Sequence, residues 1–292
     1  VGAFHDEDRD GLVTYSSQGA LHLYLGGAAG LSTTAYHVRY GAVPSPTGWQ
    51  AQNSIELGHA LTAGDIDGDG YCDAVVSSYK YSGNDGAVFV YQGGPTGLSE
   101  DPIAAWTGES ATSGGSDHFG RHLSAGDVNG DGKDDILVGE WAYDTPGVSS
   151  SNHGAAWLFL GRDFSTSQPV TAFDDTESAD WSLLGNSSYD YIGHDVSIGD
   201  IDGVPPLDLI ISGVHEEISG GTNNTGTVQA FYGVQGGVPA ATPDQEWAGE
   251  TNGEWFGMFT ASIGDVNGDA SGDLFVHSHR DPALGIRVGQ PR

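Results

Sequence analysis

The sequence predicts an all-β protein built from repeated units, and three observations support this prediction. Glycine makes up 47 of 292 residues, and the apolar residues come in short β-branched runs bounded by Gly and Asp clusters, which is the pattern of buried strands. No long window shows the i, i+3, i+4, i+7 apolar spacing of an amphipathic helix. An Asp-rich motif recurs in steps of 62, 73 and 65 residues, beginning at Asp65, Asp127, Asp200 and Asp265. Such repetition indicates units that pack on their neighbours.

Each Asp-rich motif begins like a calcium loop. Between Gly64 and Asp73, three aspartates stand at alternate positions and are followed by glycine. An EF-hand would need a bidentate Glu at position 12, but that position holds Val76 here and valine in the motifs at Asp127 and Asp265. The closing acid stands at position 9 instead, and a β-branched run follows it. The sequence therefore predicts a calcium loop between two strands.

Three other landmarks accompany the loops. A degenerate copy of the loop begins at Asp6, and an apolar-Gly pair precedes the later loops at residues 57–58, 119–120, 192–193 and 256–257. Downstream of the loop comes a strand that begins at a glycine, namely Gly19, Gly86, Gly154 or Gly226. An aromatic residue in a polar setting then marks a last strand, which we place at Trp49, Trp106, Phe173 and Trp247.

This combination of motifs resembles the FG-GAP repeat, the blade of the integrin-alpha-type β-propeller, over nearly the whole chain. The resemblance implies four antiparallel strands per blade, A to D, with the calcium loop between A and B. One small sheet cannot bury its faces alone, so the blades must stack. We expect a single β-propeller domain over residues 1–292, most simply of five blades with the first and last trimmed, at 1–56, 57–118, 119–191, 192–255 and 256–292. The alternative is part of a seven-bladed propeller.

Three loops carry a full set of oxygen ligands for Ca²⁺, from side chains at positions 1, 3, 5 and 9 and the backbone carbonyl at position 7. The glycine at position 4 predicts a sharp turn with positive φ. The second unit provides Asp65, Asp67, Asp69, Tyr71 and Asp73. The third unit provides Asp127, Asn129, Asp131, Lys133 and Asp135. The fifth unit provides Asp265, Asn267, Asp269, Ser271 and Asp273.

Two further loops have incomplete ligand sets, so their occupancy stays open. In the fourth unit position 5 is Val204, where a water could replace the ligand, and the remaining acids are Asp200, Asp202 and Asp208. In the first unit position 9 is threonine, and the remaining acids are Asp6, Asp8 and Asp10. We expect the calcium to be structural, because an ion that binds only the folded chain stabilises the fold.

The composition narrows the possible partners and the compartment. With 40 acids against 9 Lys and Arg, the net charge of −31 argues against nucleic-acid binding, which needs a basic face. No apolar run reaches 18 residues, so no membrane span is expected. The single Cys72 cannot form an internal disulfide and leaves the compartment open. Weak calcium sites, with Kd of roughly 10⁻⁴–10⁻³ M, suit extracellular modules, so we expect a secreted or cell-surface protein.

A ligand is expected on the face opposite the calcium loops. In a four-stranded blade the B–C and D–A loops lie on that face, and binding residues concentrate on loops of rigid scaffolds. Aromatic residues there suit sugars or protein side chains. The candidates are Tyr79, Tyr81, Trp141, Tyr143, Trp181, Tyr189 and Tyr191. His59 and His194 follow two of the apolar-Gly pairs, and we expect each to satisfy a local turn; the alternative is that two or more histidines converge there.

The leading hypothesis is a calcium-stabilised extracellular binding or adhesion module that recognises a glycan or a protein, as adhesive and lectin-like members of the resembled family do. One alternative is a propeller enzyme that degrades polysaccharides. Another is a purely structural part of a larger surface protein or filament. No catalytic residue is assigned, because the chain lacks G-x-S-x-G, H-E-x-x-H and C-x-x-C motifs and 40 acids make any carboxylate pair uninformative.

Overall fold

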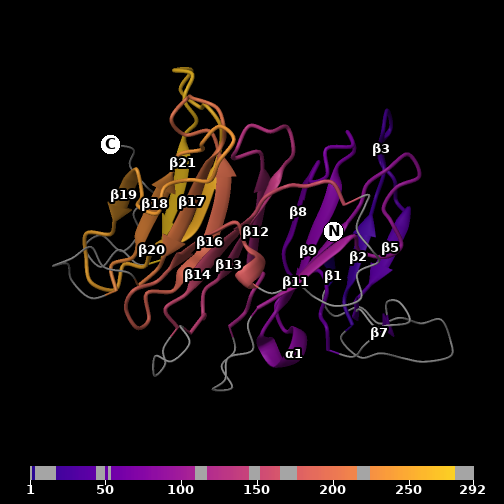
Figure 1. The fold of residues 1–292 in the computed structure, drawn as a ribbon, viewed down its shortest axis with the longest axis horizontal. Coiled ribbons are helices and arrows are strands. Elements are labelled where there is room, and N and C mark those ends of the chain that lie inside the picture. Colours follow the sequence, from indigo (N-terminus) through magenta and orange to yellow (C-terminus); the bar gives the residue numbers. More distant parts are fainter. Residues whose placement is uncertain are drawn as a thin grey trace.

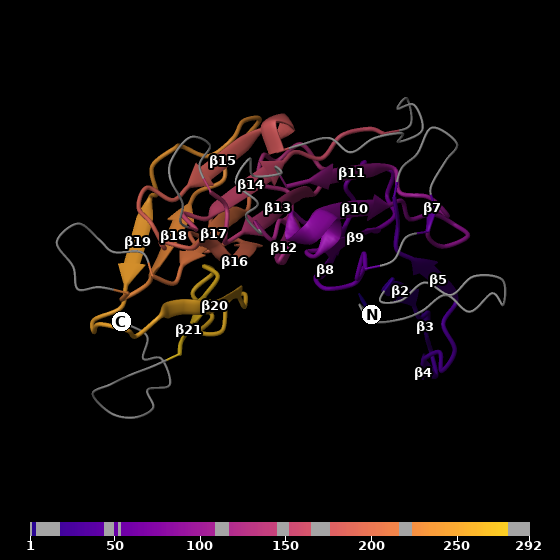
Figure 2. The same ribbon diagram turned by 90° about the horizontal axis from the view of Figure 1, so that it is seen from below.

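The structure is a computed structural model that describes residues 2–3, 18–43, 50–51, 54–108, 117–144, 152–164, 176–215 and 224–279. Small antiparallel sheets follow one another along an arc, with β2 at one end and β20 and β21 at the other (Figures 1 and 2). The predicted all-β fold of four-stranded blades is confirmed, whereas the number of blades stays a prediction. The first predicted loop, with Asp6, Asp8 and Asp10, lies outside the described residues.

Three sheets are four-stranded meanders in which each strand pairs with the next one along the chain. The second unit contains β8 (Leu61–Gly64), β9 (Asp73–Ser78), β10 (Ala87–Tyr91) and β11 (Ala104–Thr107). The third contains β12 (His122–Gly126), β13 (Asp135–Glu140), β14 (Ala155–Phe159) and β15 (Trp181–Leu184). The fourth contains β16 (Ile192–Gly199), β17 (Asp208–Gly213), β18 (Thr227–Phe231) and β19 (Gln245–Ala248).

The sheets at the two ends have fewer described strands. The first consists of β1 (Gly2–Ala3), β2 (Ala20–Leu23) and β5 (His37–Tyr40), and the last of β20 (Phe256–Ser262) and β21 (Leu274–Ser278). Two small hairpins pair β3 (Gly26–Gly27) with β4 (Gly30–Leu31) and β6 (Ala42–Val43) with β7 (Gln50–Ala51). The described helical segments are α1 (Tyr81–Asn84) and a 3₁₀ turn (Thr176–Ser178).

Two of the predicted outer strands were wrong. In the first unit the strand beside β2 is β5, not the segment around Trp49. In the third unit the strand beside β14 begins at Trp181, whereas we had placed it at Phe173. Both Trp49 and Phe173 lie outside the described residues. Each of these two stretches contains more than one aromatic residue in a polar setting. The number of residues between strand C and the outer strand also differs between units. The pattern therefore could not show which aromatic residue marks the outer strand.

The hydrophobic core lies between neighbouring sheets. Val75 and Val76 are consecutive residues of β9, and both are fully buried. Val75 belongs to a cluster shared with Val138 of the third unit, whereas Val76 belongs to a cluster shared with Leu21 of the first. Successive side chains of a strand point to opposite faces, so both faces of this sheet are covered. This explains why strand B appears in the sequence as an unbroken apolar run.

The apolar-Gly pair joins each blade to the one before it. Phe119 is fully buried, forms a backbone bridge with Gly86 at the start of β10, and donates its N–H to the carbonyl of Asp85 at 3.0 Å. Gly86 has a φ of +92°, and a Cβ there would lie 2.2 Å from the Phe119 oxygen. The same bridge joins Gly154 to Ile192. The glycine that begins strand C is therefore required by the close approach of the next blade.

Candidate metal centres and the opposite face

Four Asp-rich loops occupy the same place in successive sheets. They join β8 to β9, β12 to β13, β16 to β17 and β20 to β21, so strands lie on both sides as the sequence predicted. The glycine at position 4 has a positive φ in every one of them. The angles are 77° at Gly68, 71° at Gly130, 78° at Gly203 and 83° at Gly268.

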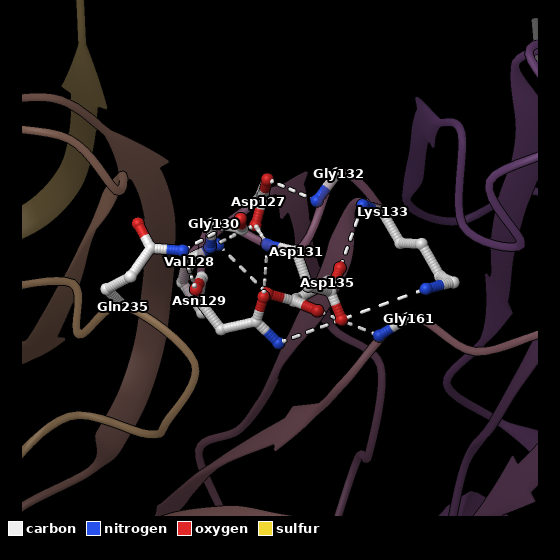
Figure 3. A network of polar contacts seen from close by, with 10 residues as sticks. All are labelled: Asp127, Val128, Asn129, Gly130, Asp131, Gly132, Lys133, Asp135, Gly161 and Gln235. Atoms are coloured by element: carbon white, nitrogen blue, oxygen red, sulfur yellow. Dashed lines mark hydrogen bonds and ion pairs between the residues drawn. The ribbon is translucent and has the colours of Figure 1, made fainter.

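In the third loop, the side chains at positions 1 and 3 hold the turn together (Figure 3). The two carboxylate oxygens of Asp127 accept the N–H groups of Gly130 at 2.6 Å and Gly132 at 2.9 Å. The side-chain oxygen of Asn129 accepts the N–H of Asp131 at 2.8 Å. These bonds close a tight turn, whereas the described acids whose oxygens converge within 4.8 Å of one another are those of the second and fourth loops.

The fifth loop repeats these bonds in a more exposed setting. Asp265 accepts the N–H groups of Gly268 at 2.5 Å and Ala270 at 2.8 Å, and these bonds lower the pKa of its carboxyl. The residue at position 7 donates its own N–H to the acid at position 5 in all three complete loops. The distances are 2.9 Å for Tyr71, 2.9 Å for Lys133 and 3.0 Å for Ser271. Coordination by their carbonyls stays a prediction.

The closing aspartate has a second role that the sequence did not reveal. Asp73 accepts the N–H of Ile66 at 3.0 Å on one oxygen and the N–H of Gly93, just after β10, at 2.7 Å on the other. Asp135 and Asp208 accept equivalent pairs of bonds. The glycine two residues after strand C in each unit was the available signal. Each oxygen keeps a lone pair, so these bonds are compatible with an ion.

The second loop fits a divalent cation. Ligand oxygens of Asp65, Asp67 and Asp73 all lie within 4.8 Å of one another. The Oδ1 atom of Asp65 is buried and has no hydrogen-bond partner. Burial raises the pKa of Asp73 to about 6, and the charges of Asp67 and Asp69 add to this effect. A bound cation would provide the missing partner and offset the repulsion between the carboxylates.

The fourth loop brings its acids together despite the missing ligand at position 5. Asp200, Asp202 and Asp208 also have oxygens within 4.8 Å of one another. Val204 is 61% exposed, and its N–H donates to Asp202 Oδ1 at 2.7 Å. This backbone hydrogen bond preserves the turn without an acid at position 5. A water molecule would have to supply the missing ligand of a bound cation.

Gln92 is a further group at the second loop that the sequence did not indicate. It follows β10, and its Nε2 lies 2.6 Å from Asp67 Oδ2 and 3.1 Å from Asp69 Oδ2. A carboxamide carries an oxygen as well as an NH₂ group, so Gln92 is able to face either a carboxylate or a cation. The third unit has Leu160 at this position, so the feature is particular to the second loop.

The opposite ends of the same strands carry a continuous series of aromatic and histidine rings, which we call the ring array. β9 runs from Asp73 at its calcium loop to Ser78, six residues, or roughly 17–20 Å at about 3.3 Å per residue. Tyr79 follows directly and starts the contacts between blades. Each ring centroid lies 3.9–5.5 Å from the next. In order, the rings are His59, Tyr79, His118, Trp141, Tyr191, His215, Trp255 and His279.

Most rings of the array occupy one of two recurring positions in the repeat. Three of its rings, His118, Tyr191 and Trp255, directly precede an apolar-Gly pair and have φ of 60°, 54° and 53°. Most of the others follow the end of strand B in the neighbouring blade. Positive φ is unusual for such bulky residues, so the contacts between blades must hold this conformation.

The predicted ligand-binding residues divide into two groups. Tyr79, Trp141 and Tyr191 lie in the ring array, and Tyr189 lies edge-on to Tyr191 at 6.1 Å with 52% of its surface exposed. The other three pack against the hydrophobic core, Trp181 as the first residue of β15 and Tyr81 as a partly buried residue of α1. Tyr143 and Trp181 are buried in core clusters, and Tyr81 packs against a third. These three are not placed to meet a ligand.

The histidines at this end meet other rings, whereas we had expected local turns. His59 lies 3.9 Å from Tyr79, and His194 lies 6.2 Å from Trp141 and 6.0 Å from His122. Burial lowers the pKa of His59 and of His194 to about 4, so both are neutral at pH 7. The charges of His122, Arg121 and His215 also lower the pKa of His194, whereas the charge of Asp195 opposes this shift.

Comparison with known families decides the assignment of the repeats. The family described as FG-GAP-like repeat matches residues 65–138, and the FG-GAP repeat matches residues 119–159. This chain is an FG-GAP repeat protein. The matched segments contain the second and third loops together with strands β9 to β14, so the family assignment and the repeat found in the structure agree.

The FG-GAP protein is similar to parts of longer curated proteins. It is 27% identical over 259 residues to a phosphatidylinositol-glycan-specific phospholipase D of Dictyostelium discoideum, covering 80% of this chain and 26% of the relative. It is 29% identical over 251 residues to integrin alpha-5 of Xenopus laevis, covering 83% of this chain and 22% of the relative. The chain thus spans about a quarter of the length of these relatives.

Two further comparisons give a shorter match and a more remote one. Integrin alpha pat-2 of Caenorhabditis elegans is 39% identical over 88 residues, which are 29% of this chain and 7% of the relative. The solved structure of rhamnogalacturonan lyase YesW matches at 14% identity with a TM-score of 0.44, over 91% of this chain and 49% of that one, too remote to bear on function. None of the helical segments in the described residues of the FG-GAP protein has the length and apolar character needed to cross a membrane.

Proposed function

We propose that this FG-GAP protein is a calcium-stabilised extracellular binding module that recognises a glycan or a protein on the face opposite its calcium loops. The second loop is the observation that carries the proposal. Three carboxylates converge there within 4.8 Å around a buried oxygen that lacks a partner. A cluster of carboxylates in a folded hairpin is stable when a hard cation neutralises its charge.

Calcium would supply positive charge and a cross-link between the strands on either side of each loop. The complete ligand sets are those of the second, third and fifth loops, and the three converging acids of the fourth loop add a further site. Binding to the folded chain alone contributes about 2.7 kcal/mol per site when calcium is 100-fold above Kd. Sites of millimolar affinity are filled outside cells, and the similarity to integrin alpha chains is in keeping with that location.

The opposite face is the place for recognition because it carries a continuous series of amphipathic rings. Tyr79, Trp141 and Tyr191 combine apolar ring faces with polar groups, and Tyr189 extends them with an exposed ring. Such residues contribute most of the binding energy at many interfaces. The rigid calcium-linked blades would hold them in fixed positions, which limits the loss of entropy on binding.

A calcium titration of the thermal melt tests the structural half of the proposal. We expect each filled loop to raise the melting temperature by roughly 5–10 °C at 100-fold excess over Kd. Magnesium at equal concentration should do less, because it demands smaller and more regular coordination. If millimolar calcium does not change the melting temperature, the assignment of the calcium loops is overturned.

Array binding tests the proposed recognition of a glycan or a protein. We expect the chain to bind a ligand on glycan or protein arrays in calcium and to lose that binding in EDTA. An absence of any array ligand would count against this part of the proposal.

A further inference from the structure

The centre of the ring array is positively charged, although the chain carries a net charge of −31. The Arg121 guanidinium lies 5.8 Å from the Tyr79 ring and 5.9 Å from the Trp141 ring, and Lys80 lies 5.5 Å from the Tyr79 ring. The protein's own cations therefore already interact with the rings that an incoming cation would use. A cationic ligand would also be repelled by them, so the electrostatics at this point favour an anion.

Two acids near these cations are already engaged in ion pairs. Glu56 pairs with Lys80 at 3.1 Å, and Asp195 pairs with His122 Nδ1 at 2.8 Å. Within the described part of the chain, no ion pair joins Arg121 to a carboxylate. Arg121 thus supplies a positive charge that the surrounding residues do not neutralise.

Hydrogen-bond donors around Arg121 also lack partners. The Nε atom of Arg121 and the Nε1 atom of Trp141 are both buried from solvent and make no hydrogen bond, and both can only donate. The Nδ1 atoms of His118 and His194 are buried without partners as well, and in a neutral imidazole such a nitrogen donates or accepts according to the tautomer. A buried donor without an acceptor is unfavourable by about 1–3 kcal/mol. The site therefore offers donors to a ligand rich in oxygen acceptors.

We propose that this part of the ring array binds an anionic oligosaccharide, with a sugar carboxylate on Arg121 and a neighbouring sugar against the Tyr189 and Tyr191 rings. The proposal rests on the recognition face named above and specifies its ligand class. Trp141 lies between the two subsites, 5.1 Å from Tyr191, which itself lies 6.1 Å from Tyr189. This separation calls for more than one sugar residue. The C–H face of a sugar is apolar and slightly positive, and it complements the negative face of an aromatic ring.

An acidic peptide fits this surface less well. Peptides dock by adding to a strand edge or by filling a groove with side chains. The strands present their ends here, and their backbone groups are already paired: Gly120 N–H with Gly139 O at 3.1 Å and Ala142 N–H with Asp117 O at 3.3 Å. A peptide would leave its own backbone without partners, whereas a sugar needs only the side-chain donors and ring faces.

The test is calorimetric titration of the whole chain, in saturating calcium, with α-1,4-linked trigalacturonate, neutral galactotriose and triglutamate. We expect trigalacturonate to bind at least tenfold more tightly than either of the others, and its affinity to fall as salt is added. Arg121→Met should weaken trigalacturonate at least tenfold. The matched control is Arg162→Met, because Arg162 also lies over two rings, Trp106 at 6.0 Å and Phe164 at 5.6 Å, outside the ring array. That variant should bind as the native chain does.

Two other variants keep the test decisive if Arg121→Met fails to fold. Trp141→Phe keeps the ring and removes the N–H, and Arg121→Lys keeps the charge and removes the planar fork, so each should weaken trigalacturonate several-fold. Equal binding of native and variant chains, equal binding of galactotriose, tighter binding of triglutamate, or no binding of trigalacturonate would each overturn the proposal. If the melting temperature still rises with calcium in those cases, the proposal of a calcium-stabilised module stands and only the proposed ligand class is wrong.

Discussion

Replacing Gly86 by alanine tests the joint between the second and third blades. Gly86 has a φ of +92°, and an added Cβ would lie 2.2 Å from the oxygen and 2.6 Å from the nitrogen of Phe119. Real Cβ contacts below 3.0 Å are essentially never seen, so the backbone on one side must move by most of an ångström. The movement would stretch the bridge to Phe119 and disturb the packing of its fully buried ring.

The expected loss has two parts. A left-handed backbone at an alanine is unfavourable by about 1–2 kcal/mol. Forcing an extra group into a packed interface adds about 1–3 kcal/mol. The variant Gly83→Ala isolates the first part, because Gly83 has a φ of +86° and a Cβ there would have nothing within 4 Å. Gly86→Ala should therefore lose about 1–3 kcal/mol more than Gly83→Ala.

The assay is urea unfolding in saturating calcium, followed by tryptophan fluorescence, with the slope of the free energy against urea compared between variants. Equal slopes show that the folded states are comparable. If the two variants differ by less than about 0.5 kcal/mol, which is within the ordinary scatter for surface substitutions, the joint does not depend on the close approach at Gly86 and the account of the motif fails.

Three further predictions concern single side chains. Asp65→Asn should reduce the rise of the melting temperature with calcium and leave the melting temperature in EDTA unchanged or higher, because it exchanges a charged carboxylate ligand for a neutral amide oxygen and removes a repelling charge; a native calcium response would contradict this. His194 is neutral when folded, with a pKa of about 4 against 6.5 unfolded, so stability should fall by up to roughly 3 kcal/mol as the pH drops from 6.5 to 4. His194→Gln should flatten that fall in urea titrations at fixed calcium, and an unchanged slope would refute the assignment. Asp195→Ala should lose about 1.5–3 kcal/mol in the same titrations, because its carboxylate holds both His122 and Thr260; a loss below about 0.5 kcal/mol would argue against this link.

The calcium loops could be predicted from the sequence because their chemistry is local. Nine consecutive residues contain every predicted ligand, and the residue at position 12, such as Val76, is enough to exclude an EF-hand. The convergence of acids in the fourth loop could not be predicted, since it depends on the backbone bond from Val204 to Asp202. The outer strand at Trp181 was missed because its pairing with β14 follows a connection of variable length.

The ring array could not be predicted because its rings come from different blades, so that the array forms only when the sheets are stacked. The sequence marked Tyr79, Trp141 and Tyr191 as loop aromatics, but not their order or their histidine neighbours. Their contacts depend on the distance between stacked sheets, which is set by core residues elsewhere. A weak signal existed: the residue before the apolar-Gly pair is aromatic or histidine at His118, Tyr191 and Trp255.

The Asp-rich loops are also joined to one another, and this would give a bound ion a wider role than closing one hairpin. Asp134, at position 8 of the third loop, donates its N–H to the Asp65 carbonyl and accepts the Asp65 N–H on its carboxylate, both at 2.9 Å. Leu207, at position 8 of the fourth loop, donates to the Asp127 carbonyl at 3.0 Å. Position 8 of the third and fourth loops thus holds position 1 of the loop before it, so an ion that ordered one of these loops would also fix the first ligand of its neighbour. At the other end of the same strands, the apolar-Gly pair bridges the same two blades. These blades are therefore fixed to their neighbours at both ends, and an ion bound in the loops would strengthen the loop end, where Ile66 and Val128 already pack into the core clusters.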